Sequence, residues 1–72
     1  MNVPAPLEQV MTQFGLSNND LVRASTEQLT HKMVRKGRKG KHLTENVRNK
    51  IFNALRAARP DSAFQMKDLF ND

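Results

Sequence analysis

The side chains of this sequence best suited to chemistry are cations, and they gather near the middle of the chain. Residues 31–41 hold six of the 12 Lys and Arg residues and no acidic residue. A block of one charge sign within a 72-residue chain needs either a partner of opposite charge or a reason to be solvated, and the partner it fits best is the phosphate backbone of nucleic acid. The block therefore predicts a nucleic-acid interface. Its cations are Lys32, Arg35, Lys36, Arg38, Lys39 and Lys41.

Other kinds of chemistry have little support in the residue types. The chain has no Cys, and its two His residues lack the spacing of a metal site. No Ser/His/Asp constellation or pair of carboxylates stands out, and Glu27 one helical turn before His31 is not a catalytic site by itself. We therefore expect no enzyme activity, no metal and no cofactor. No small-molecule ligand is evident.

The charge is unevenly distributed along the sequence. Residues 23–59 carry 11 basic and 2 acidic side chains, whereas both ends of the chain are slightly acidic. The net charge is +5 and the pI is about 10.3. A basic centre with acidic ends suggests one binding face. No signal peptide or long apolar run is visible, so we expect a cytoplasmic protein of bacterial or phage type that makes no membrane contact.

Helical signals position the basic centre. Pro6 can open a first helix after a lead-in at residues 1–5, and Gly15 can close it. Ser17 and Asp20 form a capping box for a second helix over 18–24. The apolar stripe of the first helix has the spacing i, i+3, i+4 and i+7. It consists of Leu7, Val10, Met11 and Phe14.

A third helix is predicted over residues 26–36, because Ser25 and Gln28 repeat the capping pattern. Leu29 and Met33 would face inward, with Val34 on their flank. Thr30 would lie between Met33 and Val34 as a packing residue. Gly37 would end this helix, and residues 37–43 would form a basic loop. Lys36 would lie nearer the apolar side, as a packed stem with its charge reaching solvent.

The remainder of the chain predicts two further helices. Thr44 caps a fourth helix, which Pro60 stops. Asp61 would cap a last helix over about 62–70, with Ala63, Met66, Leu69 and Phe70 at helical spacing. No segment alternates as a strand would. The inward stripe of the fourth helix is Val47, Ile51, Ala54, Leu55 and Ala58.

These elements predict an all-α fold, an irregular bundle of four or five short helices forming one domain over residues 1–72. Within it, the helices at 17–24 and 26–36 would form a helix-turn-helix, whose second helix lies in the major groove of DNA. The expected base contacts are Gln28, His31, Lys32 and Arg35. The expected phosphate contacts are Ser17, Asn18, Arg38, Lys39 and Lys41.

A family resemblance points the same way. Gly15-Leu16-Ser17-Asn18-Asn19-Asp20-Leu21 resembles the opening of the helix-turn-helix in the lambda-repressor/Cro-like (Xre-type) family, and the likeness extends over about residues 7–58. It implies a bundle of about five helices, DNA binding by the third helix, and often a homodimer. The chain departs from the family at Val22, where Ala is usual, and at Ser25 and Thr26, which replace the Gly of the tight turn. Residues 28–32 and 37–40 also resemble small uncharacterised bacterial proteins, which implies no function.

Two alternatives to a DNA-binding transcriptional regulator remain at this point. The sequence from Gly37 to Gly40 matches the Gly-x-x-Gly loop by which KH domains clamp RNA, although such domains also need a three-stranded sheet. Apolar residues in the C-terminal segment 61–72 could instead form a dimer seam or dock a partner protein. The residues concerned are Phe64, Met66, Leu69 and Phe70.

Overall fold

Helices account for all the regular structure in the computed structural model, which describes residues 5–62 and 64–70. They are α1 (Pro6–Gln13), α2 (Asn18–Ala24), α3 (His31–Arg38), α4 (Glu45–Ala58) and α5 (Met66–Leu69). No strand occurs among these residues. The prediction of an all-α bundle is therefore confirmed.

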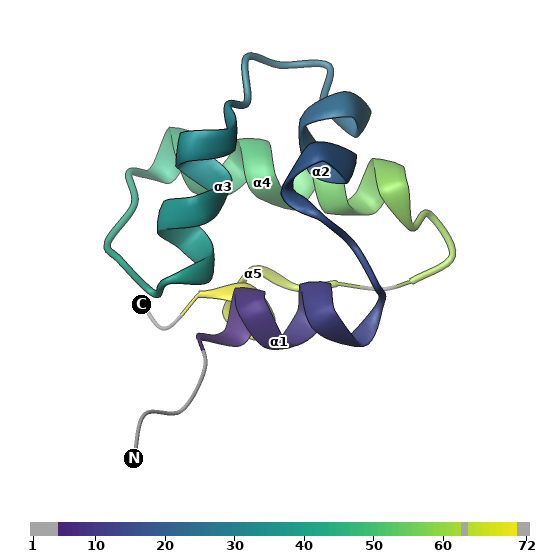
Figure 1. Ribbon diagram of the computed structural model, residues 1–72, viewed down its shortest axis with the longest axis horizontal. Coiled ribbons are helices and arrows are strands. Elements are labelled where there is room, and N and C mark those ends of the chain that lie inside the picture. Colours follow the sequence, from purple (N-terminus) through teal and green to yellow (C-terminus); the bar gives the residue numbers. More distant parts are fainter. Residues whose placement is uncertain (1–4, 63, 71–72) are drawn as a thin grey trace.

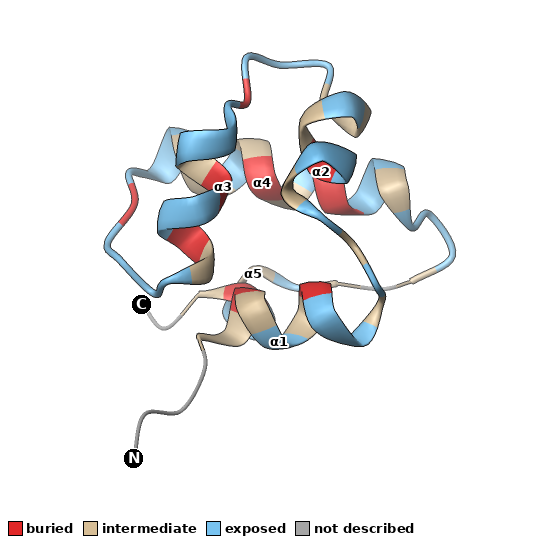
Figure 2. Cartoon of the chain, viewed as in Figure 1, coloured by how far each residue is buried: buried red, intermediate tan, exposed pale blue. Residues whose placement is uncertain are grey.

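The longest helix, α4, is the element on which the bundle is assembled. Figure 1 shows α2 and α3 side by side against α4, and α1 below them with the short α5 next to it. Helix α1 also packs against α3, and α5 packs against both α1 and α4. Every helix therefore contributes to one shared interior, which is buried where the five helices converge (Figure 2).

The core consists of ten buried apolar residues, drawn from all five helices and from two of the loops. Burial of a Leu or Ile side chain stabilises the fold by about 1.5–3 kcal/mol, so these residues supply most of the favourable free energy. No polar side chain is buried among the described residues. The core residues are Leu7, Met11, Leu21, Leu29, Val34, Leu43, Ile51, Ala54, Leu55 and Leu69.

The first two helices begin and end where local chemistry predicts. Pro6 occupies the first turn of α1, and Gly15 follows the helix at φ +67°, a conformation that suits glycine. Ser17 Oγ accepts from the Asp20 N–H at 3.2 Å, and Asp20 Oδ2 accepts from the Ser17 N–H at 2.8 Å. The backbone hydrogen bond from Ser17 is the main reason why the pKa of the Asp20 carboxyl is lowered.

The start of α3 differs from the prediction by five residues. Ser25 does not cap a helix; its Oγ accepts from the Glu27 N–H and donates to the Glu27 carbonyl, each at 3.0 Å, and so closes a local turn. Residues 25–30 are consequently non-helical. The cap is Thr30, whose Oγ1 accepts from the Met33 N–H at 3.2 Å. The predicted packing role of Thr30 is therefore wrong, since this residue is exposed.

The inward side of α3 also differs from the prediction, because Leu29 lies in the preceding turn and not on this helix. Val34 is fully buried, whereas Met33 is only half-buried. Gly37 does not end the helix but lies inside it, buried where α3 meets α1. A Cβ atom on Gly37 would lie 2.7 Å from Leu7 Cδ2, so glycine permits this close approach. The chain leaves α3 through Gly40, at φ +77°.

The fourth helix agrees with the prediction and the fifth does not. Thr44 Oγ1 caps α4 by accepting from the Val47 N–H at 3.3 Å. Asp61 lies in a turn, with the Ser62 N–H donating to the Arg59 carbonyl at 3.1 Å, instead of capping a helix over 62–70. Ala63, which was expected in that helix, is outside the described residues. The helix does not extend back to residue 62 because Phe64 packs against α1: it makes an edge-to-face contact with Phe14, with 5.4 Å between the ring centroids.

Candidate nucleic-acid interface

Five cations meet on the outer side of α3 and the loop after it. They line a single shallow hollow of the surface, and no acidic residue lines that hollow with them. We call this set the α3 cationic surface; it consists of Lys32, Arg35, Lys36, Lys39 and Lys41. All five residues are exposed.

Helical geometry and one turn bring these cations together. Lys32, Arg35, Lys36 and Lys39 follow one another at the i, i+3, i+4 and i+7 spacing of a helix face. Lys41 joins them because its backbone N–H donates to the Lys36 carbonyl at 3.1 Å, which folds the loop back against the end of α3. The side-chain nitrogens of the five make no hydrogen bond or ion pair to any other described residue.

The residues predicted to contact bases are only partly brought together. His31, Lys32 and Arg35 lie on α3 and are exposed. Gln28, expected on the same helix face, lies instead in the 25–30 turn, where its carbonyl accepts from Lys50 Nζ at 3.4 Å. Its side chain is exposed but does not belong to the helix. The prediction of one helix over 26–36 carrying all four residues is therefore wrong.

Two of the residues predicted to contact phosphate are engaged inside the protein. Arg38 Nε and Nη2 donate to the two carboxylate oxygens of Glu8, at 2.6 and 2.8 Å. Arg38 Nη1 donates to Asn18 Oδ1 at 2.8 Å. We call this set of contacts the Arg38 clamp, because it joins α3 to both α1 and α2. Arg38 was expected in a flexible loop; it belongs to α3 and is half-buried.

The clamp lowers the pKa of its carboxylate. The hydrogen bonds from Arg38 are the largest cause of a lowered Glu8 pKa, and a hydrogen bond from Thr12 Oγ1 at 2.9 Å acts in the same direction. The carboxylate in turn raises the pKa of the Arg38 guanidinium. Both groups therefore remain charged at neutral pH, and the ion pair is maintained.

The other predicted phosphate contacts divide into two groups. Ser17 uses its side chain and backbone N–H in the capping box of α2. Lys39 and Lys41 are exposed members of the α3 cationic surface. Sequence reasoning missed Lys36, which is exposed in the same hollow and is not a packed stem. Lys36 faces outward because the buried residues of α3 are Val34 and Gly37, and Lys36, two residues after Val34, lies on the opposite side of the helix.

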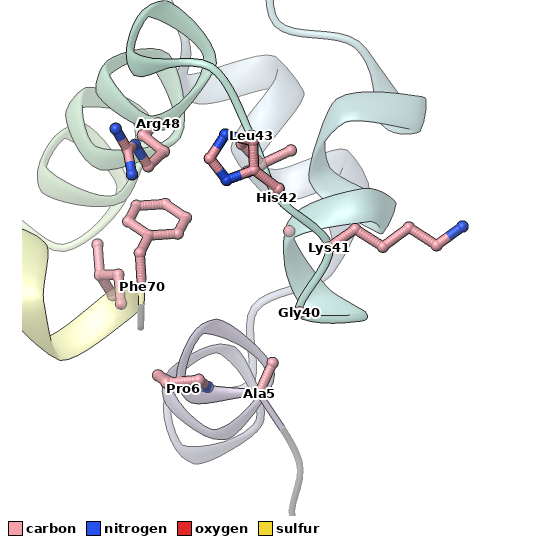
Figure 3. A pocket seen from close by; sticks show the side chains of 10 residues that line it. Ala5, Pro6, Gly40, Lys41, His42, Leu43, Arg48 and Phe70 are labelled. Carbon is pink, nitrogen blue, oxygen red and sulfur yellow. The ribbon is translucent and has the colours of Figure 1, made fainter. Parts of the chain in front are cut away.

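A second cavity lies on the other side of the loop that follows α3. It has a volume of about 130 Å³. Figure 3 shows Arg48 beside the Phe70 ring in this cavity, with the Lys41 side chain extending away from it into solvent. The lining joins the start of α1, the loop and α4, and it brings together no pair of acid and base residues. It is formed by Ala5, Pro6, Gly37, Gly40, Lys41, His42, Leu43, Arg48, Leu69 and Phe70.

Neither a cluster of metal ligands nor a membrane-spanning helix occurs among the described residues. Among the described residues, no three His, Asp or Glu side chains are grouped so that they could hold a metal ion. No described helix has the length and apolar character needed to cross a membrane. Comparison of the chain with protein-family models, curated protein sequences and solved structures finds no match.

Proposed function

We propose that this protein binds duplex DNA through α3 and acts as a small transcriptional regulator. The observation that carries the proposal is the α3 cationic surface, on which five exposed cations gather without a single acidic neighbour in their hollow. Such a surface attracts a polyanion, and Lys and Arg on one helix face are the usual electrostatic footprint of a nucleic-acid-binding domain.

The dimensions of α3 support the choice of duplex DNA. With its side chains an α-helix is about 10–12 Å across, so the major groove of B-DNA, about 12 Å wide, admits a helix such as α3. Only one side of α3 is committed to the fold, through Val34 and Gly37. The opposite side is free to enter a groove while Lys39 and Lys41, beyond its end, contact phosphates. The resemblance of residues 15–21 to the helix-turn-helix of Xre-type regulators favours the same role.

The Arg38 clamp adds a second line of support. It fixes the C-terminal end of α3 to α1 and α2 through three charge-assisted hydrogen bonds. A helix held in this way loses little conformational entropy when it binds, which favours affinity. Arg38 and Asn18 thus support the interface from behind it, and we do not propose them as phosphate contacts.

Titration of the protein with duplex DNA at several salt concentrations tests the proposal. Insertion of five cations into the counterion atmosphere of the duplex predicts that log K falls with log salt at a slope of about −4 to −5. Lys39→Ala should reduce the magnitude of that slope by about 0.9 and weaken binding to all sequences alike. Lys67→Ala, at an exposed lysine of α5, is the matched control and should leave the slope unchanged. Absence of binding at low salt would refute the proposal.

The RNA-binding alternative finds no comparable support in the geometry. Gly37 and Arg38 are helical, and Gly37 is buried, so residues 37–40 do not form an open Gly-x-x-Gly loop. The three-stranded sheet that accompanies such a loop is absent from the described residues. We therefore do not carry this alternative forward.

A homodimer formed through the C-terminal segment stays a prediction. Leu69 is buried in the core of its own chain, and Phe64 and Phe70 are half-buried and pack against that core. Met66 is half-buried as well, so the apolar residues near the C-terminal end of this segment that keep exposed surface are Met66 and Phe70. If these two form a dimer seam, Phe70→Ala should shift the sedimentation coefficient from dimer to monomer. A monomer for both the original chain and the variant at micromolar concentration would exclude the seam.

A further inference from the structure

The side chains that α3 offers to a DNA groove share an unusual chemical property. The helix reads His-Lys-Met-Val-Arg-Lys-Gly-Arg and contains no Asn, Gln, Ser, Thr, Asp or Glu. Lys and Arg are donors only and cannot accept a hydrogen bond. On the part of α3 that faces outward, Lys32, Arg35 and Lys36 therefore present hydrogen-bond donors alone, and only His31 at the first turn can also accept.

The amide that could both donate and accept lies in the turn before α3 and not on this helix face. Gln28 is the amide that sequence reasoning placed among the base-contacting residues, and an amide pairs with adenine because it both donates and accepts. The structure sets Gln28 off the helix, in a turn whose carbonyl is held by Lys50 of α4. The Thr30 hydroxyl, at the start of α3, accepts from the Met33 N–H as the helix cap.

The four bases differ in what they offer to such a surface in the major groove. Guanine presents two acceptors, O6 and N7, and no donor. Adenine presents one acceptor beside one donor, cytosine presents a donor, and thymine presents one acceptor beside a methyl group. Guanine is therefore the base whose edge matches a donor-only surface. The planar fork of Arg35 can pair with both of its acceptors at once, and a lysine ammonium can bridge them.

We propose that α3 selects duplexes by their guanines, with Arg35, Lys32 and Lys36 donating to guanine O6 and N7, while Lys39 and Lys41 hold phosphate. This inference rests on the proposed duplex binding and specifies its sequence class. It assigns guanine-containing sites on either strand, in place of the adenine contacts that Gln28 would have made from the helix.

The test removes one acceptor atom from the DNA and leaves the protein unchanged. The full chain first selects tight-binding duplexes from a random pool at moderate salt. The guanines of a selected duplex are then replaced by 7-deazaguanine, which keeps base pairing but lacks N7, and the adenines of a second copy are replaced by 7-deazaadenine. We expect guanine at the enriched positions. The dissociation constant should rise by roughly 5- to 150-fold for each guanine read, and the 7-deazaadenine duplex should bind as before.

Protein variants give an independent readout of the same contacts. Arg35→Gln should move the preference at one position from guanine to adenine, because glutamine both donates and accepts. Lys39→Gln, the matched control outside the reading set, should weaken binding while leaving the base preference as it was. Both residues are exposed, and circular dichroism of each variant checks that the helices are retained.

The outcomes separate this inference from the proposed function. Enrichment of A·T pairs, no enrichment at all, or equal affinity for the guanine and 7-deazaguanine duplexes would overturn the guanine preference while duplex binding stands. Failure to bind any duplex at low salt would overturn both.

Discussion

The Arg38 clamp makes the sharpest prediction about stability, because its residue was expected in a flexible loop. Replacing Arg38 with Met keeps an unbranched stem and removes the guanidinium that contacts Glu8 and Asn18. The Arg38 side chain is 23% exposed and that of Glu8 is 34% exposed, so solvent screens part of the attraction. Exposed ion pairs contribute about 0.2–1 kcal/mol, and a two-oxygen contact with a third hydrogen bond belongs at the upper end.

The variant should therefore lose about 1 kcal/mol of unfolding free energy. For a chain of this size that corresponds to a fall of about 4–8 °C in Tm, measured by circular dichroism at pH 7 and moderate salt. Glu8 keeps its hydrogen bond from Thr12 and its access to water in the variant, so no penalty for a buried unpaired charge is added.

The matched control is the neighbouring lysine, Lys39→Met. Lys39 is exposed and its side chain has no partner among the described residues, so the unfolding free energy of this variant should change by no more than about 0.5 kcal/mol, as is typical of surface changes. A double-mutant cycle that combines Arg38→Met with Glu8→Gln isolates the interaction between the two side chains. It should give a coupling free energy that is favourable to folding. Equal Tm values for Arg38→Met, Lys39→Met and the original chain would refute a structural role for the clamp.

Three further predictions address pH, packing and helix start. The pKa of Glu8 is lowered mainly by the hydrogen bonds from Arg38, so the stabilisation from the clamp is present above the usual carboxyl pKa and is lost as pH falls through the lowered value. In urea unfolding at pH 7, Glu8→Gln should therefore be less stable than the original chain. The difference in unfolding free energy should disappear in acid. Gly37→Ala should destabilise, since overpacking against the fully buried Leu7 costs about 1–3 kcal/mol and outweighs a helix-propensity gain of about 1 kcal/mol; a higher Tm would contradict the close contact. Thr30→Ala should cost about 1 kcal/mol as a lost cap, and it should lower the helical ellipticity more than Ser25→Ala does; the reverse order would place the start of α3 at Ser25.

The candidate interface could be located from the sequence but its membership could not. The cations of residues 31–41 are visible as a block, and exposed Lys32, Arg35, Lys39 and Lys41 do gather at one hollow. The predictions for Arg38 and Lys36 were both wrong: Arg38 was expected to contact phosphate and is engaged inside the protein, whereas Lys36 was expected to pack and is exposed. Arg38 is bound by Glu8, which is 30 residues away in the chain, and a contact over that separation cannot be predicted from a local sequence pattern. Lys36 faces outward because Val34 and Gly37 form the inward side of α3, and Leu29 is buried from the preceding turn instead.

Elements whose signals are local and have no competing alternative could be predicted from the residues alone. The capping box of Ser17 and Asp20 sets the start of α2, Gly15 ends the turn after α1, and the apolar stripe of α4 makes one face of that helix inward. In each case the hydrogen bonds or the periodicity are satisfied within a few residues. Tertiary contacts then set only the angles at which these helices pack against one another.

Where two local solutions compete, long-range packing selects between them. Ser25 and Thr30 both have the chemistry of a helix cap, and only the second places Val34 and Gly37 against Leu7 in the core while Leu29 is buried from the turn. The C-terminal spacing would also suit a longer helix, yet Phe64 packs on the Phe14 ring from an extended segment and α5 shortens to Met66–Leu69. Burial of an apolar side chain outweighs the few tenths of a kcal/mol that separate such local alternatives, because local propensities differ by less than about 1 kcal/mol.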